Sequence, residues 1–139
     1  MWGLIKFTLL GNPKPLARHR STRDGRMYDP SHRDKRDMWL QIAKYKPEVA
    51  FSGDVLLNIA FYMQRPKSHY RTGKYKHLLK DKYKDVEYHS FKPDLDNLVK
   101  MVADVVQGKD RMIIDDSQIC ILLAEKKYGE PARTEVVIQ

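Results

Sequence analysis

The chain has 139 residues, with 26 lysines and arginines against 18 acidic residues and a formal net charge of +8 at pH 7. This length fits one domain spanning residues 1–139 that buries an ordinary core, and the charge favours polyanionic partners over neutral small molecules. A single cysteine excludes a disulfide framework and a thiolate metal cluster, and no apolar run is long enough to span a membrane. We therefore expect a soluble, cytoplasmic protein.

The N-terminal part begins with a strand and continues into a basic loop. Apolar and polar residues alternate over residues 4–10, which predicts a strand that ends at Gly11-Asn12-Pro13. The segment at about residues 12–30 has little apolar content. It is either a solvated loop or a surface that grips a phosphate backbone. Its candidate phosphate-binding residues, which would bind DNA if the partner is a nucleic acid of that kind, are Arg18, Arg20, Arg23 and Arg26.

The middle of the chain predicts a helix and a central strand. Ser31 is a candidate N-cap, and an apolar stripe at helical spacing follows it, so a helix is expected over about residues 32–46. Residues 54–63 are largely apolar on both faces, which predicts a strand in the middle of the sheet. Its expected neighbours are two strands over residues 119–126 and 133–138, joined by a hairpin. Cys120 is expected to be a buried small hydrophobe.

A long basic insert occupies about residues 64–92, with nine basic residues against three acidic ones and four interleaved tyrosines. One interpretation is a flexible, solvated insert with a short helix near residues 76–84. The other is an arm whose lysines neutralise phosphates and whose tyrosines stack on unpaired bases. Three histidines there match no familiar zinc spacing. The candidate DNA-binding residues of the insert are Arg71, Lys74, Lys76, Lys80 and Lys82.

The most informative stretch is residues 91–119, which combines two pairs of aspartates with a helix between them. Apolar residues at helical spacing predict the helix, and Gly108 is its stop signal. Asp94 precedes the helix in extended backbone, so its carboxylate and that of Asp96 can meet at the helix N-terminus. A third carboxylate is expected to join them from Asp115-Asp116, between apolar runs that are typical of buried strands.

Carboxylates without cysteine or histidine ligands suit Mg²⁺, or Mn²⁺, far better than Zn²⁺. Aspartates before helices and in turns are, however, ordinarily caps and turn formers. Lys100 lies one helical turn from Asp96, where it is either a surface ion-pair partner or a contact to a phosphate held by the metal.

These residues resemble a known family. The motif P-D-L-D-N-L-x-K, then Asp104, then D-D-S-Q-I is similar to the signature of the RusA-like Holliday-junction resolvases, small endonucleases of phage and bacterial origin. The resemblance implies a metal-dependent homodimer that cuts four-way DNA junctions in recombination and repair. It assigns the metal ligands to Asp94, Asp96 and Asp116 and a catalytic role to Lys100. Asp104 and Asp115 would support the ligands, and the choice between Asp115 and Asp116 stays open.

The order of predicted elements implies an α/β (α+β) domain, a RusA-like small mixed sheet of about four strands covered by two main helices. The leading functional hypothesis is a Mg²⁺-dependent endodeoxyribonuclease selective for branched DNA. The alternatives are a basic nucleic-acid-binding module without enzymatic activity and, more weakly, a phosphatase that acts on small molecules.

Overall fold

The computed structural model describes residues 3–17 and 20–139. Its centre is a mixed sheet with the strand order β1-β6-β4-β5, in which β4 and β5 are parallel and the other pairs are antiparallel. The predicted fold class is confirmed, and so is the interior position of the strand predicted over residues 54–63. The strands are β1 (Ile5–Leu10), β4 (Val55–Met63), β5 (Ile119–Tyr128) and β6 (Arg133–Ile138).

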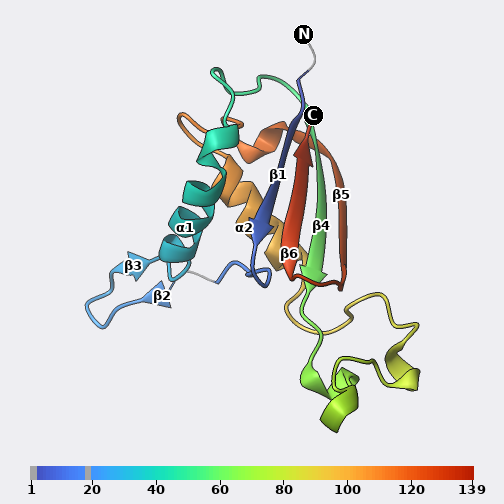
Figure 1. The fold of residues 1–139 in the computed structure, drawn as a ribbon. Helices are drawn as coiled ribbons and strands as arrows, with labels where there is room; N and C mark the ends of the chain where they lie inside the picture. Colours follow the sequence, from blue (N-terminus) through green and yellow to red (C-terminus); the bar gives the residue numbers. More distant parts are fainter. Residues whose placement is uncertain (1–2, 18–19) are drawn as a thin grey trace.

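Two helices pack against the same side of the sheet, α1 (His32–Ile42) and α2 (Leu95–Val106) (Figure 1). Alternate residues of the strands point toward them, so one strand face is buried while the other faces solvent. The apolar stripe of α2 completes the core, with Leu98, Met101, Val102, Val105 and Val106 all buried. Among the described residues, no helix is long and apolar enough to cross a bilayer.

Two local predictions near α1 need correction. Helix α1 begins at His32 as expected, but the Ser31 hydroxyl makes no capping bond and instead accepts a hydrogen bond from the Ala17 N–H at 2.9 Å. The preceding segment is not only a loop. It forms a small hairpin of β2 (Arg20–Ser21) and β3 (Met27–Tyr28), because Gly25 provides the positive φ that the tight turn requires.

The prediction that residues 119–124 form a buried strand is half wrong. They form a strand, but β5 lies at the edge of the sheet, and Cys120 is exposed. The side chains of Ile121, Leu122 and Leu123 are 54%, 48% and 52% exposed. Of the apolar run before it, Met112 and Ile113 are buried in a turn rather than a strand, and Ile114 is exposed. The apolar character of β5 is therefore not explained by this chain's own core.

The basic insert has no α-helix, and of the short helix suggested near residues 76–84 only the 3-10 turn Asp81–Tyr83 is present. Three short 3-10 turns shape it, Lys67–His69, Gly73–Tyr75 and Asp81–Tyr83, and it extends beyond the end of the sheet (Figure 1). Its centre is the buried His69 ring, which stacks on Tyr83 with 3.9 Å between ring centroids. The Arg65 guanidinium lies over the Tyr128 ring and donates hydrogen bonds to the carbonyls of Tyr83 and Val86. These contacts attach the insert to the end of β5.

Candidate metal centre

The first pair of aspartates lies at the N-terminus of α2. Asp94 has extended backbone (φ −69°, ψ 142°) and precedes the first helical residue, as predicted. Its side chain makes no capping bond, and within residues 3–17 and 20–139 neither the Asp94 nor the Asp96 carboxylate has a hydrogen-bond or ion-pair partner. Both residues are exposed. The positive end of the helix stabilises the two carboxylates, and their free oxygens can accept a cation or its hydration water.

The segment that leads to Asp94 is held by Lys126, a residue the sequence analysis missed. Its Nζ donates to the carbonyl oxygens of Phe91 and Pro93 at 2.5 and 2.6 Å. Lys126 pairs in register with the buried Phe61, on the strand face that packs toward the helices. The sequence offered one signal for this role, a lysine on an otherwise apolar, inward strand face, because a charge there requires polar partners.

The second pair of aspartates lies in the turn before β5, and its two members are held differently. The Asp115 carboxylate accepts a hydrogen bond from the Ser117 N–H at 3.0 Å and caps a short 3-10 turn. The Ser117 hydrogen bonds lower the pKa of Asp115. The Asp116 carboxylate is exposed and has no partner among the described residues. The Asp115 carboxylate therefore stabilises the turn, whereas the Asp116 carboxylate makes no hydrogen bond or ion pair with the described residues.

The two pairs lie at opposite ends of α2. The Asp116 N–H donates at 2.9 Å to Oε1 of Gln107, which occupies the C-cap position of the helix, whereas Asp94 occupies the N-cap position. A helix of 12 residues separates its ends by about 18 Å. Consistent with this separation, no three His, Cys, Asp or Glu residues in the described ranges are close enough to hold a metal. Within the described residues, the predicted meeting of three carboxylates at one helix N-terminus therefore does not occur, and the two aspartate pairs lie apart.

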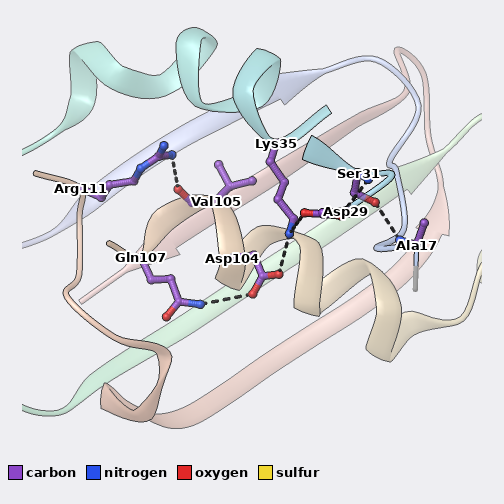
Figure 2. Close-up of polar contacts among 8 residues, drawn as sticks. All are labelled: Ala17, Asp29, Ser31, Lys35, Asp104, Val105, Gln107 and Arg111. Atoms are coloured by element: carbon purple, nitrogen blue, oxygen red, sulfur yellow. Dashed lines mark hydrogen bonds and ion pairs between the residues drawn. The ribbon is translucent and has the colours of Figure 1, made fainter. Parts of the chain in front are cut away.

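The remaining polar residues of α2 also differ in their surroundings. Lys100 is exposed and lies within 4.0 Å of no carboxylate in the described ranges, so the simple ion pair with Asp96 is absent. Asp104 lies toward α1, 3.2 Å from Lys35 Nζ, and accepts a hydrogen bond from Gln107 Nε2 (Figure 2). Desolvation opposes the charge of Lys35, but hydrogen bonds to Asp29 and Asp104 outweigh it and raise the pKa of this lysine.

The predicted DNA-binding residues fall into three groups. Arg18 lies outside the described residues, and the side chain of Arg20 is likewise outside them. Arg71 braces the insert, since it donates to the Leu79 carbonyl and pairs with Asp81. Lys80 is only partly exposed. The exposed cations lie on the β2–β3 hairpin and along the insert, and they are Arg23, Arg26, Lys74, Lys76 and Lys82.

Known proteins are similar to this one over almost the whole chain. A family model described as Endodeoxyribonuclease RusA matches residues 11–139. The chain is also 34% identical over 140 residues to the uncharacterized protein YqaN of Bacillus subtilis (strain 168), and the match covers 97% of this chain and 95% of that protein. Both aspartate pairs and the basic insert lie within the residues that the family model matches.

Proposed function

The chain belongs to the RusA family of endodeoxyribonucleases, and from this premise we propose that it is a Mg²⁺-dependent homodimer that resolves four-way DNA junctions. The observation that supports the proposal is that unpartnered, exposed carboxylates lie at both ends of α2, Asp94 and Asp96 at one end and Asp116 at the other. We propose that each group is half of a metal site and call the two groups half-sites. A passive DNA-binding protein has no use for uncompensated carboxylates beside a basic surface, because they repel phosphates unless a cation intervenes.

Asp94 and Asp96 would provide one part of the metal site and Asp116 the other. Asp116 is favoured over Asp115 because the Asp115 carboxylate is already engaged with the Ser117 N–H. Oxygen ligands alone suit Mg²⁺ and also accept Mn²⁺. When bound, such an ion orients water and offsets negative charge at the scissile phosphate. Lys100, exposed on the same helix and unpaired with Asp96, is available to contact that phosphate.

The two half-sites can be completed by a second copy of the chain. Edge strand β5 exposes three consecutive apolar residues, centred on Leu122, that a soluble monomer gains nothing by displaying. Its outer edge is bridged only near its end, by Tyr88 opposite Lys127, which leaves the first part of the strand free within the described chain. Pairing of two β5 edges around a two-fold axis near Leu122 would cover these side chains with their own copies.

Such a two-fold pairing is antiparallel, so the start of β5 in one subunit lies beside the end of β5 in the other. Asp116 immediately precedes the start of the strand, and Lys126, near its end, holds the segment before Asp94. The arrangement therefore brings Asp116 of the partner subunit toward Asp94 and Asp96. Two composite sites result, one for each of the two strands that must be cut in a junction.

The exposed cations of the hairpin and insert would bind the arms of the junction. Tyr75 and Tyr88 are exposed and available for stacking on unpaired bases, whereas Tyr83 is occupied by His69. The insert adjoins the Asp94 half-site, because His89 and Phe91 lead directly into it and contact Lys126. DNA held by the insert thus lies next to the proposed site of cleavage.

The direct test compares four-way, three-way and linear DNA of equal length, each with Mg²⁺, with Mn²⁺ and with a chelator. We expect paired, symmetric cuts in the four-way junction only when a divalent cation is present. Equal cleavage of linear duplex would indicate a general nuclease. Tight junction binding without cleavage under all three conditions would favour the passive binding module.

A further inference from the structure

A continuous chain of polar contacts joins helix α1 to the loop that carries Asp116. Lys35 Nζ lies 2.7 Å from the Asp29 carboxylate and 3.2 Å from the Asp104 carboxylate. Asp104 accepts a hydrogen bond from Gln107 Nε2 at 3.2 Å (Figure 2). The other end of the same amide, Gln107 Oε1, accepts from the Asp116 N–H at 2.9 Å. The chain of contacts thus ends on the backbone of the proposed metal ligand.

The donor and acceptor groups of these residues determine which way the Gln107 amide is oriented in this series of contacts. An ionised carboxylate accepts hydrogen bonds but cannot donate them, so Asp104 selects the NH₂ group of Gln107. The carbonyl of Gln107 is then turned toward the Asp116 N–H, which it can accept. The Lys35 ammonium lies 3.2 Å from the other oxygen of Asp104, and this ion pair is partly shielded from solvent, with side-chain exposures of 21% and 29%.

A second glutamine holds the neighbouring part of the loop but does not reach Asp116. Gln118 Oε1 accepts from the N–H groups of Ile114 and Asp115 at 2.8 and 3.1 Å, and its Nε2 donates to the carbonyls of Phe51 and Gly53. Gln118 therefore ties the loop to the segment before β4. Gln107 provides the contact between the Asp116 backbone and α2.

We propose that Gln107, oriented by Asp104 and Lys35, is a positioning residue that sets Asp116 for metal binding. The inference rests on the proposed function, since it assumes that Asp116 is a ligand. Groups that orient metal ligands typically change metal affinity by roughly 10- to 100-fold when removed. Gln107 and its partners would act in this way without touching the metal or the DNA.

The test is a pair of substitutions that first break and then rebuild the hydrogen-bond order. Gln107→Glu places two carboxylates against each other at Asp104, and we expect Mn²⁺ binding to weaken about tenfold or more. Asp104→Asn combined with Gln107→Glu restores a donor opposite an acceptor, and the new carboxylate still accepts from the Asp116 N–H. We expect the double variant to bind Mn²⁺ within about threefold of wild type, as coupled neighbours do.

Mn²⁺ binding is measured directly, by the electron paramagnetic resonance signal of the free ion, and the metal dependence of junction cleavage is measured in parallel. Gln41→Glu is the matched control, because Gln41 is exposed on α1 and, within residues 3–17 and 20–139, accepts only from the Leu10 N–H. If Gln107→Glu fails to fold, Gln107→Met replaces it, since it keeps the side-chain length and removes both hydrogen bonds, and it should also bind Mn²⁺ about tenfold more weakly.

The outcomes separate the two levels of the proposal. Wild-type protein that neither binds Mn²⁺ nor cleaves junctions would refute the proposed function itself. Wild-type binding and cleavage together with unchanged Mn²⁺ affinity in the Gln107 variants would overturn the role of Gln107. The same conclusion follows if the double variant binds Mn²⁺ no better than Gln107→Glu alone.

Discussion

The two ends of α2 carry the same kind of group but hold it by different means. At the Asp94 end, one charged side chain, Lys126, holds two main-chain carbonyls of the preceding segment. At the Asp116 end, two neutral amides hold three consecutive N–H groups of the loop. In both cases the protein fixes the backbone and leaves the carboxylate free. If these aspartates bind the metal as proposed, their positions are set by hydrogen bonds to the main chain, and substitution of the side chains that make those bonds should alter metal binding.

The sharpest way to break the comparison is to disable each end in a different subunit. Asp96→Asn and Asp116→Asn should each abolish cleavage while junction binding persists, because each removes a ligand and a repulsive charge. In mixed dimers of the two variants, a composite site retains one intact combination, so cleavage of one strand should return. Nicking assays on the mixture measure this. Sites built within single chains would leave the mixture as inactive as its parents.

Lys100 tests whether the Asp94 end does more than bind metal. If its ammonium contacts the phosphate in the transition state, Lys100→Ala should lower the single-turnover cleavage rate by roughly a hundredfold. Lys100→Arg should also be impaired, because the planar fork differs in shape and reach from an ammonium. Neither variant should shift the melting temperature noticeably, since the residue is exposed. Wild-type cleavage rates in both variants would show that Lys100 is only a surface charge without a role in cleavage.

Lys126 tests the means by which the Asp94 end is held. Lys126→Met keeps most of the aliphatic stem and removes both hydrogen bonds to the Phe91 and Pro93 carbonyls. We expect cleavage to fall by about tenfold, and stability by roughly 1–3 kcal/mol for the carbonyls left without a donor. Urea denaturation and cleavage rates measure the two effects. Lys127→Met is the matched control, because Lys127 pairs with the neighbouring Glu125 instead. Equal behaviour of the two variants would contradict the role of Lys126.

Asp115 should give the smallest effect and sharpens the contrast with Asp116. Asp115→Asn retains an oxygen that can accept from the Ser117 N–H, and asparagine caps about as well as aspartate. Metal affinity and melting temperature should therefore stay close to wild type, whereas Asp116→Asn should lose metal binding. A reversal, with Asp115→Asn the more damaging change, would make Asp115 the direct ligand.

Local chemistry made much of this protein predictable from its sequence. The helix over Leu95–Val106, the extended backbone of Asp94 and the central strand β4 follow from side-chain periodicity and from the residue types at helix ends. The motif around these aspartates also identified the family correctly. These features depend on neighbours a few residues apart, so the sequence contains all the information they require.

Tertiary structure alone decided where the parts of the site lie. An apolar run such as that of β5 predicts that its side chains are buried. It does not indicate whether they are buried by residues of the same chain or by a second copy of it. The distance between Asp94 and Asp116 depends on α2 running the opposite way to β5, and the roles of Lys126 and Gln107 depend on hydrogen bonds to segments distant along the chain or across a turn. Such contacts arise from the packing of whole elements, because it is packing that brings groups separated in sequence within hydrogen-bonding distance.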